Sequence, residues 1–150
     1  MSKEHEFLQQ VLKGHRSAVL FCELLFRISQ VMDDIYDGDK EVSRRDFTEM
    51  MWEALVELPS NEFYMSNFAV LQPLVRSALN DWYDANELEH SGEHDQSIAF
   101  ILRDQLTGLV SQCAYLVGGY QWLRHVSAEV RRFFHDETLV DYMNGLGGVK

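Results

Sequence analysis

Apolar residues recur along this chain of 150 residues at steps of three and four, the spacing that places side chains on one face of an α-helix. The clearest stripe consists of Phe21, Leu25, Ile28, Met32 and Ile35. Val19, Leu24 and Val31 lie on flanking faces, which predicts a central helix that is buried on several sides. Gly38 follows the stripe and is the expected end of this helix, because glycine readily adopts the left-handed conformation found at helix C-termini.

A second helix is expected to begin after Ser43, since Ser43-Arg44-Arg45-Asp46 resembles a capping box with Asp in place of the usual Glu. Its apolar positions are Phe47, Met50, Met51, Ala54, Leu55 and Leu58. Pro59 is expected to end it. The next stripe consists of Phe68, Leu71, Val75, Leu79 and Trp82. Pro73 lies inside that stripe, which predicts a kink or a helix that begins just before it.

The last third of the chain continues the helical pattern. A fourth helix is expected to open near Asp95, with apolar positions at Ile98, Leu102, Leu106, Leu109, Cys113 and Leu116. Ser127 is the expected cap of a short helix, and a final amphipathic segment covers residues 138–144. No segment alternates at period two, so we predict an all-α fold, a single compact bundle of five to seven helices. Residues 1–144 are expected to form one domain and residues 145–150 a flexible C-terminal tail.

Acidic residues are concentrated in the middle of the chain. The net charge is −11, and residues 33–95 contain sixteen acids against four bases. Such a surface disfavours direct binding to phosphate backbones and to anionic membranes. It favours a protein partner with a basic surface, a divalent cation, or the nucleic-acid-binding groove of another protein. Cys22 and Cys113 lie in apolar surroundings, and no stretch is long and apolar enough to span a bilayer, so we expect a cytoplasmic protein.

The acidic run DGDKEVSRRDF (Asp37–Phe47) resembles the later part of an EF-hand loop. Asp37 and Asp39 match two alternate ligand positions of that loop, and Asp46 matches its closing acid. The resemblance implies a Ca²⁺ site formed by Asp34, Asp37, Asp39, Glu41 and Asp46. The run departs from the family because Lys40 replaces the glycine of the sharp turn and the closing acid is the shorter Asp. A solvated corner, with Gly38 closing one helix and Ser43 capping the next, explains the run without an ion and is the interpretation that we prefer.

A second set of carboxylates suggests Mg²⁺ chemistry. Glu49 and Glu53 on the second expected helix, with Asp81 and Asp84 on the third, resemble the carboxylates of small all-α nucleotide pyrophosphohydrolases of the MazG type. The resemblance implies a Mg²⁺-dependent nucleotide or diphosphate hydrolase that uses these acids to bind the metal and activate water. The spacing of four between Glu49 and Glu53 departs from the ExxE pattern of that family. The polar face of an amphipathic helix explains the row equally well.

The chain as a whole resembles small acidic helical proteins of tailed bacteriophages. Three stretches carry this resemblance: ALVELPSNEFY (Ala54–Tyr64), LVGGYQWL (Leu116–Leu123) and RRFFHDE (Arg131–Glu137). The resemblance implies a protein of the host cytoplasm that acts as an inhibitor, a nucleic-acid mimic or an assembly factor. Our leading interpretation is therefore a non-enzymatic protein that engages a basic protein surface, with self-association left open.

The direction in which the acids point separates these interpretations. Convergence of the carboxylates into one cleft favours the hydrolase. Acids spread along an outward face beside exposed aromatic residues favour binding to a partner, since aromatic anchors dominate the energetics of interfaces. The aromatic candidates are Trp52, Trp82, Tyr120, Trp122, Phe133 and Phe134.

Overall fold

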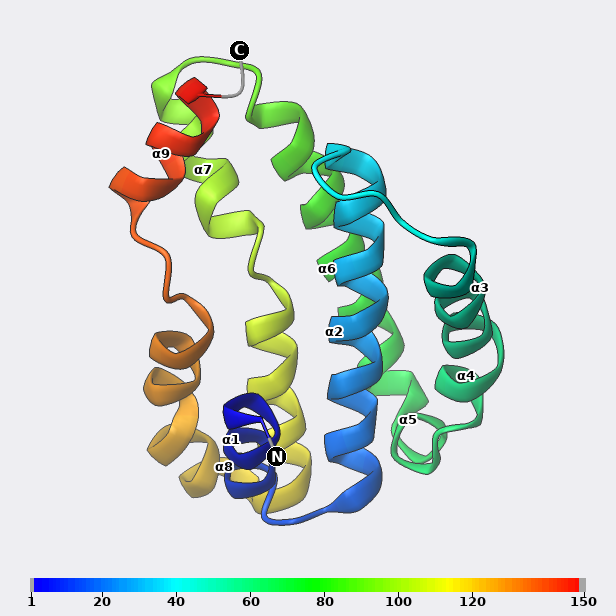
Figure 1. Ribbon diagram of the computed structural model, residues 1–150. Coiled ribbons are helices and arrows are strands. Elements are labelled where there is room, and N and C mark those ends of the chain that lie inside the picture. The colour runs from blue at the N-terminus through cyan, green and yellow to red at the C-terminus, as the bar shows by residue number, and fades with distance from the viewer. Residues whose placement is uncertain (1, 149–150) are drawn as a thin grey trace. The chain divides into compact units, whose positions relative to one another are not determined.

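The structure is a computed structural model that describes residues 2–148 of the chain (Figure 1). Every regular element in this range is a helix, and no strand occurs among the described residues, so the predicted all-α fold is confirmed. The chain divides into two compact units, Met1–Leu71 and Gln72–Lys150. Each unit is described by itself below.

The first unit is organised around one long helix, α2 (Arg16–Asp37). Helix α2 contacts every other helical segment of this unit. These segments are α1 (Lys3–Val11), α3 (Arg44–Trp52), the π-helical turn η1 (Glu53–Glu57), α4 (Leu58–Ser60) and α5 (Glu62–Ser66). The buried residues of α2 are Ala18, Val19, Phe21, Cys22, Leu24, Leu25 and Ile28. The predicted central helix is thus confirmed over most of its length, whereas Ile35 near its C-terminal end is exposed.

The corner between α2 and α3 has the caps that the sequence predicts. Gly38 adopts a left-handed conformation with φ of 68°, and its amide donates a hydrogen bond to the carbonyl of Asp34. The hydroxyl of Ser43 accepts a hydrogen bond of 3.0 Å from the amide of Asp46. These two caps close one helix and open the next, as the sequence predicts.

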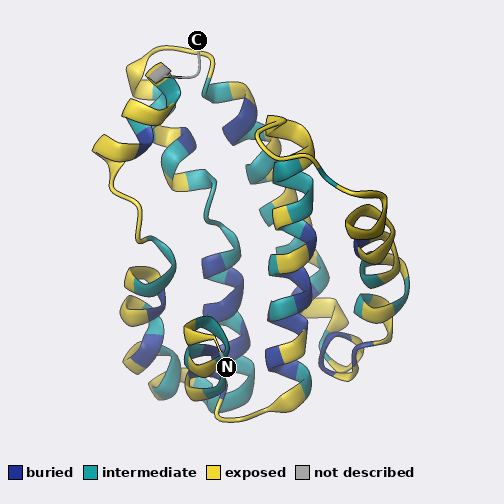
Figure 2. Ribbon diagram, viewed as in Figure 1, coloured by how far each residue is buried: buried dark blue, intermediate teal, exposed yellow. Residues whose placement is uncertain are grey.

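The second predicted helix is present but differs in its interior and in its burial. Helices α3 and α4 are joined by η1, and the chain leaves the helix after Ser60 rather than at Pro59. Of the six apolar positions that the sequence assigns to this helix, only Met50 is buried. Figure 2 shows α3 as exposed over most of its length. This helix therefore presents apolar side chains to the solvent.

Four further helices follow in the part of the chain that the structure describes. Helix α6 (Phe68–Leu88) carries the chain from the first unit into the second with Pro73 inside it, and α7 (Glu93–Leu102), α8 (Leu106–Phe134) and α9 (Leu139–Gly148) follow. The single helix expected from Asp95 onward is in fact two helices, because residues 103–105 form a turn between α7 and α8. Helix α8 is broken at Gly119, where φ is 83° and ψ is −173°. This conformation is essentially restricted to glycine.

Two expectations at the C-terminal end are revised. No new helix begins at Ser127, which lies inside α8. Helix α9 follows Thr138, whose hydroxyl accepts a hydrogen bond from the amide of Asp141. It extends to Gly148, four residues beyond the expected end at Asn144, so the tail predicted from residue 145 is helical as far as the structure describes it. The last two residues of that tail lie outside the described range.

Candidate functional site

The five carboxylates of the predicted Ca²⁺ corner lie along the end of α2 and the beginning of α3. The side chain of Asp34 accepts a hydrogen bond of 3.1 Å from Gln30, one turn earlier in α2. Asp37, Asp39, Glu41 and Asp46 are exposed. Asp46 lies in the first turn of α3, where a carboxylate interacts favourably with the helix dipole. The Ca²⁺ site at this corner stays a prediction.

The carboxylates of the predicted Mg²⁺ site fall into two separate sets. Glu49 and Glu53 belong to the first unit, whereas Asp81 and Asp84 lie on the part of α6 that belongs to the second. Glu53 accepts a hydrogen bond of 2.8 Å from Arg27, and Asp84 accepts one of 3.3 Å from Asn80. Burial raises the pKa of Asp81, and the neighbouring charge of Asp84 raises it further. Among residues 2–148, no group of three or more His, Cys, Asp or Glu side chains is arranged to hold a metal ion.

A different arrangement of acids lies where α3 and η1 meet α2. A surface hollow of about 450 Å³ is lined by Arg27, Thr48, Glu49, Trp52, Glu53 and Glu57. We call these six residues the acidic–aromatic face. Trp52 is 60% exposed, although tryptophan is among the residues that are most buried on average. The face thus combines three carboxylates, one guanidinium and an accessible indole.

Hydrogen bonds hold the acidic–aromatic face in shape. Arg27 of α2 reaches Glu53 through two nitrogens, Nε at 2.8 Å and Nη2 at 2.7 Å from the same carboxylate oxygen. The indole Nε1 of Trp52 donates a hydrogen bond of 3.2 Å to Glu57. Glu49 pairs with Arg45 one turn away at 3.0 Å, in a geometry that is largely exposed. One arginine within the face is therefore balanced against three glutamates, and the remaining charge of the hollow is negative.

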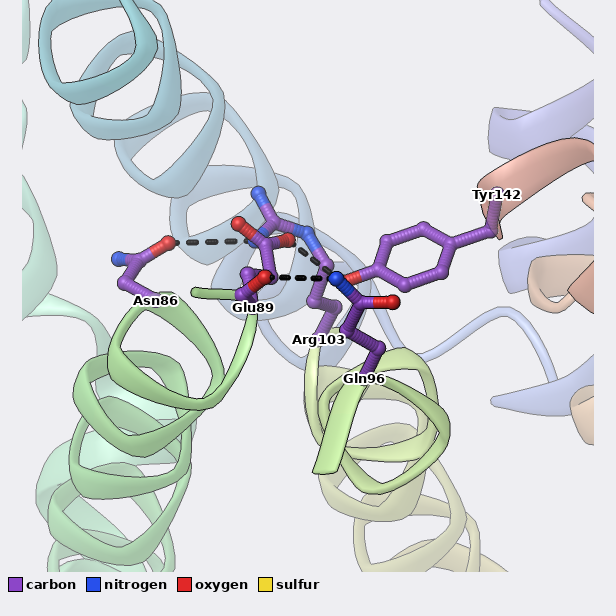
Figure 3. Close-up of polar contacts among 5 residues, drawn as sticks. All are labelled: Asn86, Glu89, Gln96, Arg103 and Tyr142. Atoms are coloured by element: carbon purple, nitrogen blue, oxygen red, sulfur yellow. Dashed lines mark hydrogen bonds and ion pairs between the residues drawn. The ribbon is translucent and has the colours of Figure 1, made fainter. Parts of the chain in front are cut away.

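The second unit contains a polar network that the sequence interpretation missed (Figure 3). Glu89, just after α6, accepts hydrogen bonds from Arg103 and from the hydroxyl of Tyr142, each at 2.5 Å. Arg103 also donates to Asn86 at 3.2 Å, and Gln96 donates to the backbone carbonyl of Glu89 at 3.0 Å. These contacts join the end of α6, the helix α7, the turn after it and α9. We call Asn86, Glu89, Gln96, Arg103 and Tyr142 the buried polar network.

Burial sets the electrostatics of this network. The side chains of Arg103 and Glu89 are only 18% and 12% exposed, and Tyr142 is buried. Burial raises the pKa of Tyr142, and the hydrogen bond to Glu89 and the charge of Glu89 raise it further. No local motif reveals the network, because its bonded members Glu89 and Tyr142 are 53 residues apart in the chain.

A second hollow of about 580 Å³ lies in the second unit, where the ends of α7 and α8 meet the start of α9. Its lining residues are Phe100, Ile101, Gln105, Arg131, His135, Asp136, Glu137, Thr138 and Leu139. His135 Nδ1 lies 3.1 Å from a carboxylate oxygen of Asp104. Burial raises the pKa of Asp104, against the opposing effect of His135 and Arg103. Charges of both signs line this hollow, so it favours no single ligand class.

Comparison with known proteins assigns no function to the chain. No family model matches the chain, and no match is found among curated proteins or solved structures. The EF-hand and bacteriophage resemblances therefore stay predictions. No helix among the described residues combines the length and the apolar character needed to cross a lipid bilayer.

Proposed function

We propose that this chain is a non-enzymatic interaction protein, acting in the cytoplasm, that engages a basic protein surface through its acidic–aromatic face. The observation that carries the proposal is Trp52, which is 60% exposed and lies in a hollow with three glutamates. Tryptophan is enriched among the residues that dominate interface energetics. An indole in a hollow where three carboxylates outnumber one arginine suits an arginine or lysine side chain of a partner.

The chemistry of recognition follows from the contacts within the face. A guanidinium or ammonium group stacked on the ring of Trp52 gains about 0.5–1 kcal/mol at an exposed site. Glu49 adds Coulomb attraction, because its exposed pairing with Arg45 is weak and is readily exchanged for a partner's cation. Glu57 fixes the indole through its hydrogen bond to Nε1. The face is thus ordered before binding, which lowers the entropy lost on association.

Titration with a fluorescein-labelled, arginine-rich peptide tests the proposal. We expect Trp52→Ala to weaken binding by roughly two- to fivefold, as the loss of a cation–π contact implies. The double variant Glu49→Gln/Glu57→Gln is expected to weaken binding further and to reduce its dependence on salt. Fluorescence anisotropy at low and at physiological ionic strength measures both effects.

Two matched variants control for general acidity. Tyr120 is another exposed aromatic residue, at 69%, and no acid lies within four positions of it in the sequence. Glu93 and Asp95 provide a second pair of acids, in the first turn of α7. The proposal is wrong if Tyr120→Ala and Glu93→Gln/Asp95→Asn weaken peptide binding as much as the changes in the acidic–aromatic face do. It is also wrong if no peptide binds.

A further inference from the structure

The helix α8 is folded into a hairpin at Gly119. Residues 106–118 form one arm and residues 120–134 the other, and the two arms run in opposite directions (Figure 1). The guanidinium Nη2 of Arg131 lies 3.4 Å from the position that a Cβ atom would occupy at Gly108. In a straight helix, which rises about 1.5 Å per residue, these two residues would be about 35 Å apart. The second arm therefore folds back along the first.

A second contact has the same centre. His135, which follows α8, places its Nδ1 3.1 Å from a carboxylate oxygen of Asp104, which precedes α8. This pair and the pair of residues 108 and 131 are both spaced equally about the bond between Gly119 and Tyr120. The corner is thus the centre of the hairpin. A change of the backbone at this corner alone would separate the second arm, with the chain that follows it, from the first.

The closed corner requires glycine at two positions. Within α8, which the structure describes throughout, Gly119 alone has a backbone outside the helical region, and its conformation is essentially restricted to glycine. At Gly118, an added Cβ atom would lie 2.7 Å from the Cβ of Trp122. In a straight helix the Cβ atoms of residues i and i+4 are about 5–6 Å apart, so this overlap would disappear. A continuous α8 therefore tolerates side chains that the hairpin excludes.

The chain that follows the corner is held to the rest of the second unit by side-chain contacts. His135 reaches Asp104, and the hydroxyl of Tyr142 donates a hydrogen bond to Glu89. The ring of Tyr142 also lies 5.2 Å from that of Phe100, and α9 packs against α7. All of these partners precede the corner in the chain. A second copy of the chain offers the same partners in the same arrangement.

We propose that α8 opens at Gly119 into one continuous helix and that two copies of the chain exchange the segments that follow, forming a domain-swapped dimer. Each copy then completes the buried polar network of the other with its Tyr142. Such an exchange is a low-cost route to a dimer, because it keeps the contacts of the closed form and changes only the corner. It concerns the second unit and does not depend on the acidic–aromatic face.

Replacement of the corner glycines tests the proposal. Gly119→Ala strains the closed corner of every monomer, and the exchange relieves that strain in both chains of the dimer. We expect the dimerisation constant from sedimentation equilibrium to rise at least about thirtyfold, with the helical circular dichroism unchanged. Gly118→Ala is expected to act in the same direction, because its methyl group overlaps Trp122 only in the closed form. Gly145→Ala is the control and should behave as wild type, since a Cβ atom at Gly145 of α9 meets no other atom within 4 Å.

A crosslink shows whether the segments are exchanged. Asp104→Cys/His135→Cys places two thiols at a contact that joins the two sides of the corner, and a short thiol-to-thiol reagent connects them. Cys22 and Cys113 are buried and stay out of reach of the reagent in the folded protein. In dilute protein that keeps Gly119 we expect the crosslink within one chain. In the Gly119→Ala background we expect a covalent dimer on a denaturing gel, whereas Asp104→Cys without its partner cysteine should give none.

Three results would overturn the proposal. In the first, Gly119→Ala is folded and monomeric, so that the corner closes without glycine. In the second, the dimer carries its crosslinks within single chains, so that the copies pack side by side. In the third, Gly145→Ala dimerises as strongly as Gly119→Ala. If the corner variants lose their helical signal, the double-cysteine chain that keeps both corner glycines is refolded from urea at high concentration: crosslinks between chains support the exchange, and monomer at every concentration overturns it.

Discussion

The two units each combine a carboxylate, a guanidinium and an aromatic hydrogen-bond donor, but they expose these groups to different extents. In the buried polar network, Glu89 pairs with Arg103 and accepts a hydrogen bond from Tyr142. In the acidic–aromatic face, Glu53 pairs with Arg27 beside Trp52. The aromatic residue is 7% exposed in the first case and 60% exposed in the second. A carboxylate, a guanidinium and an aromatic donor are thus closed off in one unit and open in the other.

This difference shows that burial, rather than residue type, decides what such a triad does. A buried carboxylate that loses its partner is strongly destabilising, so the closed triad acts as a structural tie between helices. An exposed pair contributes little to stability because water and salt screen it. Its groups are accessible, however, and a partner can engage them. We therefore expect changes in the closed triad to alter folding and changes in the open triad to alter binding.

The largest expected effect is that of Arg103→Ala. The change leaves Glu89 as a largely buried carboxylate without its arginine, and breaking a buried pair in this way costs about 3–5 kcal/mol of the free energy of unfolding. Urea denaturation followed by circular dichroism measures the loss. A loss below about 1 kcal/mol is typical of an exposed pair, and it would show that Glu89 is hydrated in solution and that the contrast between the two triads is wrong.

Removal of the hydroxyl in Tyr142→Phe is expected to have a smaller effect. A hydrogen bond to a charged group contributes about 1.5–3 kcal/mol. The pKa of Tyr142 lies above its ordinary value of 10.0, because burial and Glu89 favour the neutral phenol. The stabilisation is therefore complete below pH 10 and is lost as the pH rises above it, because the unfolded tyrosine ionises first.

The alkaline limb of the stability curve provides the measurement for Tyr142→Phe. Wild type and variant are compared by urea denaturation between neutral pH and pH values above 10, and we expect the gap between their free energies of unfolding to narrow above pH 10. Burial also raises the pKa of Tyr64, which is present in both proteins. Only the difference between their free energies of unfolding therefore reports the ionisation of Tyr142. A constant gap would contradict a role for the neutral phenol in the network.

The sequence predicts the elements of this fold better than its surfaces. Gly38 and Ser43 mark helix ends through local conformation and capping, and both ends are found where they were predicted. The helix α1 was not anticipated, although Leu8, Val11 and Leu12 are buried at helical spacing, because the polar residues around them obscure the pattern. The break at Gly119 depends on a backbone conformation that the residue type permits but does not require.

The candidate site was only partly predictable for a related reason. The periodicity of Phe47, Met51 and Leu55 indicates a helix, but the same spacing suits a core face and an exposed interface. Exposure depends on which neighbour covers the helix, and this is a property of tertiary packing. The tie between Glu89 and Tyr142 likewise joins residues that are 53 positions apart, which no local pattern can connect. Trp52, in contrast, was an aromatic candidate from the sequence, and its nearness to acids was the signal.

The smallest expected effect on stability is that of Arg27→Ala. This variant tests whether the exposed groups around Trp52 act in binding rather than in folding. Its pair with Glu53 is half exposed on the arginine side, so we expect a loss of at most about 1 kcal/mol in urea denaturation. The same change removes Arg27, the one cation among the described residues that line the hollow, and frees Glu53 for a partner. Binding of the arginine-rich peptide should therefore strengthen while the fold is retained, the opposite of what a structural tie would show.

Arg16→Ala is the control, because it alters an exposed arginine of the same unit and changes the net charge equally. Anisotropy titrations should give a larger gain for Arg27→Ala than for Arg16→Ala; equal gains would mean that net charge, and not the arrangement around Trp52, attracts the peptide.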